Sequence, residues 1–450
     1  MRISNGLLAA LLPALVALAW ANALGGGFQF DDFNVIVDNA AVHSWSAWYA
    51  AQPGIRPLLK LSYTFNWVLD PHPFGFLLFN LLCHALNALL VFALCQRRLD
   101  TGATAAAIAA AIFALHPAQT EAVTYICGRS VSLMAAFYLG SLYAASSARP
   151  LARDGLAPLL FGAALLTRET AWTLPLALWL LNAARGLPAR ENWRALRPHC
   201  IVLVGMAALI ALLPAYQRML GHVLSIRSPL DNLLLQVDGW RYLITQPLLT
   251  LQTNIDPELP SAPAFDMGWY ARAAALIALL AVAFVQRRRP LGLALLWFFV
   301  HLLPTNSLLP RNDIANDRQL YLALLGPALL LALALLRLRG RTGQALALVL
   351  LLALATATAL RNRDYRDEIA LWQVTVEGSP GGARAWNNLG YAYQLAGRRP
   401  DALRAYRLAL QLAPDDDRAR VNLRLLEENA DGVGGANTHP RTPAASNAAH

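Results

Sequence analysis

The sequence predicts an all-α protein in which a polytopic membrane bundle of about eleven spans precedes a small C-terminal domain of helical repeats. Two observations predict the membrane part. Of the 450 residues, 57% are apolar and only 14% are charged, whereas soluble domains carry about 25% charged residues. A chain with so few charges must keep most of its surface out of water. The third observation, a repeat pattern near the C-terminus, predicts the soluble part.

The expected spans are apolar runs that approach the length needed to cross a hydrocarbon core of roughly 30 Å. They lie near residues 7–24, 75–95, 102–116, 130–147, 156–168, 171–184, 200–216, 270–285, 291–303, 320–336 and 343–360. Several are short and rich in alanine, so some are expected to be broken helices inside the bundle. Residues 1–24 also resemble a signal peptide, with Arg2, an apolar run and Ala-Asn-Ala at 21–23. Cleavage of this segment is the alternative to a first span.

Arginine clusters in alternate connections predict the orientation in the membrane. The clusters are Arg97/Arg98, Arg149/Arg153, Arg185/Arg190/Arg194/Arg197, Arg287/Arg288/Arg289 and Arg337/Arg339/Arg341. By the positive-inside rule they face the cytoplasm, and the C-terminus lies outside. Residues 217–269 must then stay on the outer side, with the helix-like part 231–251 lying along the interface or re-entering.

Composition also bears on partners and on the cellular location. The net charge of +10 could suggest nucleic acid, but the arginines lie between apolar runs rather than on one polar face. Lys60 is the only lysine, and the Ala, Leu and Arg bias favours a bacterial inner-membrane protein. The four cysteines lack metal-ligand spacing, so the sequence predicts no metal cluster.

A 34-residue repeat pattern identifies the C-terminal domain. The tetratricopeptide pattern requires Trp, Leu-Gly, Tyr, Ala, an aromatic residue and Pro at fixed offsets. These positions are occupied by Trp386, Leu389, Gly390, Tyr393, Ala402, Tyr406, Ala409 and Pro414. Residues 365–380 resemble half of a preceding repeat, and 417–430 resemble a capping helix. We therefore expect a membrane domain over 1–362, a repeat domain over 363–430 and a disordered tail over 431–450. The repeat domain is expected either to bind a protein partner or only to pack on the membrane part.

Charged residues gather on the predicted outer side, where each is costly unless it has a function. A carboxylate there could take a hydroxyl proton, and arginines could neutralise a departing phosphate. The candidates are Asp31, Asp32, Arg56, Glu121, Arg129, Arg168, Glu169 and Arg318.

Each candidate also has a purely structural interpretation. Asp31 and Asp32 could be a solvated loop pair, and Arg168 and Glu169 an ion pair between spans. Glu121 and Arg129 could form a local salt bridge. Polar contacts between helices would explain Asn80, His84 and Asn87, which share one face of the second span.

The order of these motifs resembles a known family. After the first span come Asp31-Asp32, then Arg56-Pro57-Leu58, Asn80 and His84, and His116-Pro117 with Thr120-Glu121 ahead of Gly128-Arg129. Thr167-Arg168-Glu169, Leu303-Pro304 with Asn306-Ser307, and Asp317-Arg318-Gln319-Leu320-Tyr321 follow. This series, ending in the repeat, is similar to the transmembrane-and-tetratricopeptide-repeat protein O-mannosyltransferases and their bacterial relatives.

The resemblance, over 28 to about 415, implies a GT-C fold and a glycosyltransferase that uses a polyprenyl-phosphate sugar. It implies transfer to a periplasmic acceptor such as a protein Ser/Thr hydroxyl, with inversion and with Asp31 as base. Asp32 and Glu121 would complete the catalytic set. The donor would contact Arg56, His84, His116, Arg129, Arg168, Glu169 and Arg318, and a carboxylate pair could also hold a divalent cation.

The sequence differs from the family pattern in two respects, and two other functions are alternatives to glycosyl transfer. The family often has Lys-Glu where this chain has Arg168-Glu169, and it usually carries many more repeats. A transporter or flippase of lipid-linked sugars would share the arginines but would not need the acidic pair. A non-catalytic scaffold that presents the repeat to partners would leave Asp31, Glu121 and Arg318 unexplained.

Overall fold

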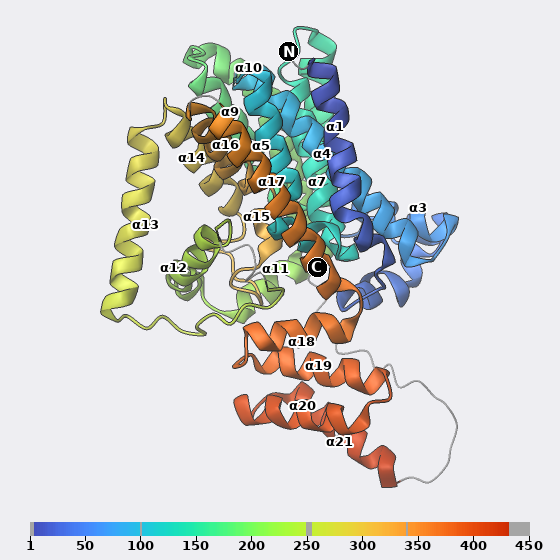
Figure 1. Ribbon diagram of the computed structural model, residues 1–450. Helices are drawn as coiled ribbons and strands as arrows, with labels where there is room; N and C mark the ends of the chain where they lie inside the picture. The colour runs from blue at the N-terminus through green and yellow to red at the C-terminus, as the bar shows by residue number, and fades with distance from the viewer. Residues whose placement is uncertain (1–3, 100, 249–253, 339–340, 432–450) are drawn as a thin grey trace.

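The computed structural model describes residues 4–99, 101–248, 254–338 and 341–431, and every regular element in these ranges is a helix (Figure 1). The fold class expected from the sequence is therefore confirmed. The α-helices that precede the repeat are α1 (Asn5–Trp20), α2 (Trp45–Ala50), α3 (Pro57–Leu69), α4 (Pro73–Arg98), α5 (Ala103–Leu115), α6 (Thr120–Val123), α7 (Arg129–Ala144), α8 (Ala157–Thr167), α9 (Leu174–Ala184), α10 (Ala189–Leu212), α11 (Pro214–Ile226), α12 (Pro229–Thr245), α13 (Met267–Val285), α14 (Pro290–Leu302), α15 (Leu320–Ala323), α16 (Leu325–Arg337) and α17 (Arg341–Arg361).

The centre of the bundle is built from α4, α5, α7 and α16, with α1 and α17 alongside (Figure 1). Helix α5 reads Ala-Thr-Ala-Ala-Ala-Ile-Ala-Ala-Ala-Ile-Phe-Ala-Leu, and most of its side chains are buried. Alanine favours helix and adds little bulk, so neighbouring helices can approach α5 closely on several sides. Helix α13 differs, because its apolar side chains are mostly exposed and it stands apart from the bundle in Figure 1.

The expected count of eleven spans is not confirmed. In the part of the chain that the structure describes, five helices are long and apolar enough to cross a membrane, or up to seven if two bent helix pairs each count as one span. The other expected runs do form helices, but α8, α9 and α14 have only 11 to 13 residues. At 1.5 Å per residue, each is shorter than a hydrocarbon core of roughly 30 Å. The chain is a multi-pass membrane protein with several short helices inside its bundle.

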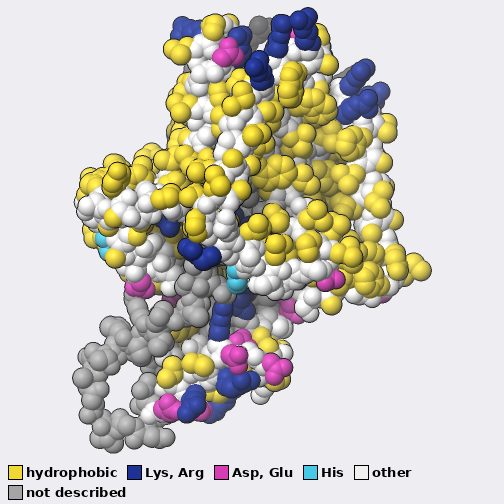
Figure 2. Space-filling model, turned by 180° about the vertical axis from the view of Figure 1, so that it is seen from behind, with side chains coloured by type: hydrophobic (Ala, Val, Ile, Leu, Met, Phe, Trp, Pro, Cys, Tyr) yellow, Lys and Arg dark blue, Asp and Glu magenta, His cyan; other side chains and the backbone are white. Residues whose placement is uncertain are grey.

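Surface composition follows this architecture. Figure 2 shows hydrophobic side chains over the flank of the bundle, with basic side chains, which are arginines, gathered at the end opposite the repeat domain. Many large apolar side chains on these helices are exposed, such as Leu18, Val204, Ile277 and Leu352. Soluble monomers rarely expose apolar patches of this extent, so a lipid-facing flank explains them. Of the arginines expected at the cytoplasmic end, Arg339 lies outside the described residues.

The repeat domain consists of α18 (Glu368–Gly378), α19 (Ala383–Leu395), α20 (Arg399–Leu412) and α21 (Asp417–Asp431). Helices α19 and α20 are the expected full repeat, while α18 and α21 occupy the places of the half repeat and the cap. A Cβ atom on Gly390 would lie 2.7 Å from the Tyr406 ring, so the crossing requires glycine there. The boundary at 362/363 stays a prediction, and the tail from 432 onward lies outside the described residues.

The repeat domain packs directly on the outer loops of the membrane part. Trp372 of α18 contacts Phe30 edge to face, with ring centroids 5.1 Å apart. Tyr125, Ile255 and Leu371 share the same buried cluster. Glu368 accepts a hydrogen bond from the Phe30 backbone N–H at 3.0 Å. The segment that carries Asp31 is therefore held by the first helix of the repeat domain.

Candidate functional site

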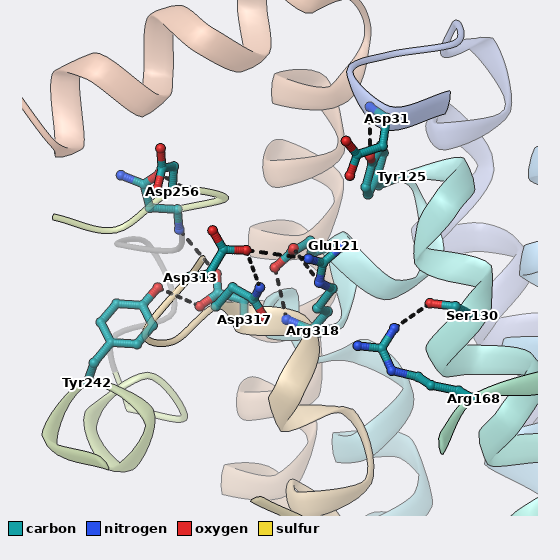
Figure 3. Close-up of polar contacts among 12 residues, drawn as sticks. Asp31, Glu121, Tyr125, Ser130, Arg168, Tyr242, Asp256, Asp313, Asp317 and Arg318 are labelled. Atoms are coloured by element: carbon teal, nitrogen blue, oxygen red, sulfur yellow. Dashed lines mark hydrogen bonds and ion pairs between the residues drawn. The ribbon is translucent and has the colours of Figure 1, made fainter. Parts of the chain in front are cut away.

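Two broken helices build the centre of the site. The pair α5 and Pro117–Val123 bends by 56°, and the pair Asp317–Ala323 and α16 bends by 58°. His116 and Pro117 explain the first bend, because proline disfavours helical conformation in the residue before it. The bends turn two short segments toward each other at the end of the bundle nearest the repeat domain. One segment carries Glu121 and the other carries Asp317 and Arg318 (Figure 3).

Glu121 and Arg318 are the central pair of this site. The Arg318 backbone N–H donates to Glu121 Oε2 at 2.9 Å, and Arg318 Nε lies 3.4 Å from Glu121 Oε1. The Arg318 guanidinium also lies 3.6 Å from Asp313 Oδ2. Only 2% of the Glu121 side chain is exposed, so the carboxylate needs this cationic partner.

A close backbone contact supports Glu121 from behind. A Cβ atom on Gly128 would lie 2.1 Å from the Glu121 carbonyl oxygen. Only glycine allows the turn at 126–128 to approach the Glu121 segment this closely. Gly128 thereby helps to define where the Glu121 carboxylate lies.

Two acidic residues beside the central pair, Asp313 and Asp317, form hydrogen bonds to the repeat domain and to α12, respectively. Arg384 of α19 donates to Asp313 Oδ1 at 2.6 Å and also pairs with Asp256. Burial opposes ionisation of Asp313, but the guanidinium groups of Arg384, Arg318 and Arg311 hold its pKa well below the usual range. Asp317 accepts a hydrogen bond from Tyr242 Oη at 2.7 Å (Figure 3).

Four arginines, Arg56, Arg168, Arg311 and Arg318, lie close enough to repel one another electrostatically. Burial, and then the charge of Arg318, lower the pKa of Arg311 to about 10. The buried Arg311 Nε has no hydrogen-bond partner in the described part of the chain. Such clustering is costly unless an anion binds among the guanidinium groups.

The carboxylate partners of the other arginines differ from those expected. Glu169 pairs with Arg56, with Arg56 Nη2 2.8 Å from Glu169 Oε2, rather than with its neighbour Arg168. Although burial opposes ionisation, Arg56 keeps the pKa of Glu169 below its ordinary value. The Arg168 guanidinium donates to Ser130 Oγ at 2.6 Å, which is its one hydrogen bond to a described residue. The guanidinium of Arg168 is thus left with unused donors.

Asp31 and Asp32 occupy different environments. Asp32 is fully buried and accepts backbone N–H bonds from Gln29 at 3.0 Å and Cys127 at 2.8 Å. Burial raises the pKa of Asp32 to about 7. Asp31 is half-buried, and its backbone N–H donates to Tyr125 Oη at 3.1 Å.

The Asp31 carboxylate belongs to the same charged group as Glu121 and Arg318. It lies close enough to Arg318 for the two charges to interact, and Figure 3 shows both residues in one view. Of the acidic pair, Asp32 is fully buried and braces the loop, whereas Asp31 is only half-buried.

Three predicted site residues have structural contacts instead. Arg129 is fully buried; its guanidinium donates to Asn80 Oδ1 at 2.7 Å, to Phe76 O at 2.9 Å and to Ser62 O at 3.0 Å. With these donors used inside the protein, Arg129 does not line the charged site. The expected Glu121–Arg129 salt bridge does not form, because Glu121 pairs with Arg318.

The two predicted histidines also have internal partners. His84 lies between Ala114 O at 2.9 Å and Tyr321 Oη at 2.7 Å, which is the polar contact between helices that its position suggested. Nδ1 of His116 accepts from the Ala118 N–H at 3.1 Å, and its Nε2 contacts Pro247 O at 3.1 Å. His116 therefore caps the segment that follows the α5 bend.

The structure adds residues that the sequence analysis did not select. Arg311 and Asp313 follow Asn306-Ser307 closely, so the motif there could have led to them. Arg384 lies among ordinary repeat positions, and Tyr125 and Tyr242 are isolated aromatics, so local sequence contains no signal for their contacts. Among the described residues, no group of three or more His, Cys, Asp or Glu side chains could hold a metal ion. The expectation of a divalent cation stays a prediction.

The fold and the charged site define a polytopic membrane protein with an attached tetratricopeptide module, and comparison with known proteins agrees. The tetratricopeptide-repeat model matches residues 383–416. The chain is 24% identical over 483 aligned residues to the protein O-mannosyl-transferase TMTC3 of Mus musculus, covering 92% of this chain and 52% of that protein.

Two relatives from Drosophila melanogaster give similar matches. The chain is 25% identical to the protein O-mannosyl-transferase Tmtc3, over 90% of this chain and 55% of the relative. It is 29% identical to Tmtc2, over 57% of this chain and 30% of the relative. These matches confirm the resemblance to the transmembrane-and-tetratricopeptide-repeat O-mannosyltransferases. The chain spans about half the length of the relatives that it matches most extensively.

Proposed function

We propose that this chain is a GT-C-type glycosyltransferase that moves a sugar from a polyprenyl-phosphate carrier to a protein Ser/Thr hydroxyl. The observation that carries the proposal is the convergence of Arg56, Arg168, Arg311 and Arg318 beside the Asp31 and Glu121 carboxylates. Both sets of groups lie where the membrane bundle meets the repeat domain. The names of the relatives support the same activity.

The charges suit each step of the transfer. A lipid-linked sugar phosphate would bind with its phosphate among the arginines, of which Arg168 and Arg311 retain unused donors. The acceptor oxygen would attack the anomeric carbon while Asp31 takes the hydroxyl proton. The bond from the anomeric carbon to the phosphate oxygen would break, and the arginines would stabilise the polyprenyl phosphate that leaves. A single displacement of this kind inverts the anomeric centre.

The remaining residues have supporting roles in this proposal. Glu121 and Asp313 hold Arg318 in place, and Glu169 holds Arg56. The repeat domain would present the acceptor, since α18 contacts the Asp31 loop and α19 contacts Asp313. We place the site on the periplasmic side of a bacterial inner membrane, because the arginine-rich end of the bundle lies opposite (Figure 2).

The test is transfer by the purified full-length chain in lipid vesicles. Polyprenyl-phosphate mannose with a radiolabelled sugar would be the first donor, and Ser/Thr-containing peptides would be the acceptors. We expect labelled peptide that forms only with active protein, and a lipid-linked sugar that accumulates in cells lacking the gene. Movement of the labelled lipid across the bilayer without labelled product would instead establish a transporter. Neither transfer nor movement, over several lipid-linked sugars, would favour a scaffold.

A further inference from the structure

A second charged site lies at the opposite end of the bundle from the repeat domain. A cavity of about 520 Å³ opens there, lined by arginines that come from three separate connections. Arg97 and Arg98 end α4, Arg185 follows α9, and Arg288 and Arg289 lie between α13 and α14. Figure 2 shows this end of the molecule rich in Lys and Arg. None of these residues belongs to the site proposed for sugar transfer.

Among the described residues, no carboxylate neutralises the positive charge of this cavity. The described residues that line it include five arginines and no Asp or Glu. None of the five forms an ion pair with a described residue, and the Arg97 guanidinium instead lies 4.9 Å from the centre of the Tyr143 ring. Like charges that converge in one cavity are unfavourable without a counter-ion. The cavity is therefore suited to an anion.

Arg98 indicates that the arginines of this cavity do more than set the orientation of the chain in the membrane. Its side chain is buried, with 4% exposed, and Nη1 donates to Asn182 Oδ1 at 2.7 Å. Asn182 is in turn held by Asn192 at 3.0 Å. The buried Nε of Arg98 has no partner among the described residues. An arginine that only sets the membrane orientation could stay in water. A buried arginine with an unused N–H donor lacks a hydrogen-bond acceptor, which a bound ligand would supply.

One wall of the cavity is apolar. Leu99, Leu293, Leu329 and Leu333 line it beside the arginines. A small apolar cavity of about 20 Å³ lies next to it and shares Arg98, Leu293 and Leu329. Arginines beside a leucine wall, at the end of the membrane helices, match a molecule with an anionic head and an apolar tail.

We propose that this cavity binds the phosphate headgroup of an anionic phospholipid, with its acyl chains along the leucine wall. In the orientation proposed above, the cavity lies at the inner leaflet, where anionic headgroups attract clustered arginines. Bound lipid would join the ends of α4, α9 and α14 through one shared counter-ion. The site is separate from sugar transfer and does not depend on that proposal.

The test measures binding of dioleoylphosphatidylglycerol to the purified full-length chain in neutral detergent by native mass spectrometry. The test variant combines Arg185→Gln, Arg288→Gln and Arg289→Gln, all exposed positions that line the cavity. The matched control combines Arg149→Gln, Arg190→Gln and Arg194→Gln, which are exposed arginines that do not line the cavity. Both variants lose the same charge.

We expect the test variant to bind phosphatidylglycerol at least tenfold more weakly, since each arginine beside the bound headgroup contributes about a fivefold factor. The control should stay within about twofold of the unchanged protein. Equal loss in both variants would mean diffuse surface attraction and would overturn the site. Unchanged binding by the test variant would overturn it as well. Inorganic phosphate or glycerophosphoglycerol that displaced the lipid at equal concentration would show a soluble-anion site instead.

Discussion

The guanidinium group of Arg384 lies 2.6 Å from Asp313 Oδ1, and through Asp313 the repeat domain contacts the charged site. Oδ2 of the same carboxylate lies 3.6 Å from Arg318, which pairs with Glu121. A residue of the soluble module thus helps to balance the charge of the residues proposed to bind the donor phosphate. The repeat domain therefore helps to hold the charged site together, and it is also the candidate binding domain for the acceptor.

Replacing Arg384 tests this link. In Arg384→Gln, Asp313 loses a cationic partner and its charge acts more strongly on Arg318, so we expect transfer to fall roughly tenfold, or ~1.4 kcal/mol. Transfer would be measured at equal amounts of folded protein. The matched control is Arg407→Gln, an exposed repeat arginine that pairs with Glu427 at 3.1 Å, far from Asp313 in the fold. Equal activity in both variants would show that the repeat domain does not act on the site through Asp313.

Replacing Asp31 tests the proposed base. Asp31→Asn keeps the size of the side chain but cannot accept a proton, so turnover should fall by about 10²–10⁴-fold. Donor binding should change little, because Asp31 addresses the acceptor. Asp70→Asn, an exposed carboxylate in the same outer region, is the control. Full turnover in Asp31→Asn would remove Asp31 from the mechanism.

Asp32 should affect stability through pH. Its pKa of about 7 in the folded protein lies above the ordinary value of 3.8. Between about pH 4 and 7 the folded protein therefore retains a proton that the unfolded chain releases, and stability falls as the pH rises through this window. Above about pH 7 this contribution is constant.

Comparison with Asp32→Asn isolates this effect from other groups. From pH 5 to 7 the unchanged protein should lose roughly 2–3 kcal/mol of stability relative to the variant. Thermal unfolding in detergent at several pH values provides the measurement. Parallel pH profiles for the two proteins would show that Asp32 does not titrate in this range.

Arg311 should bind the donor phosphate. Arg311→Gln removes a guanidinium whose Nε has no partner in the described structure, so stability should change little. Loss of a hydrogen bond to a charged group costs about 1.5–3 kcal/mol, so the donor KM should rise about 10- to 100-fold. Arg363→Gln, an exposed arginine just after α17, is the control. An unchanged donor KM in Arg311→Gln would place the phosphate elsewhere.

The side of the membrane on which the charged site lies determines whether it can act on a periplasmic acceptor. We expect residues 365–450 to be periplasmic, since the arginine clusters lie at the other end of the bundle. Alkaline phosphatase fused after Arg366 should be active, and a cytoplasm-specific reporter at the same position should be inactive. The reverse pattern would put the site on the wrong side for the proposed reaction.

Local sequence determined much of this protein. The repeat pattern located α19 and α20, with Gly390 at the close crossing, and apolar runs located the membrane helices. These features depend on residues near one another in the chain, so composition and spacing reveal them. The motif series also selected Glu121 and Arg318 and pointed to the family to which the matched relatives belong.

Tertiary structure alone decided how many helices are long enough to span and which charges meet. Glu121 and Arg318 are 197 positions apart, and Arg384 and Asp313 are 71 apart. No local pattern records such pairs, because each charged side chain looks the same in sequence whether it faces a partner, a ligand or water. For the same reason sequence could not distinguish buried Asp32 from Asp31, or the internally bonded Arg129 from Arg168. The bends of 56° and 58° bring these distant groups together, and burial then determines which of them keep donors for a ligand.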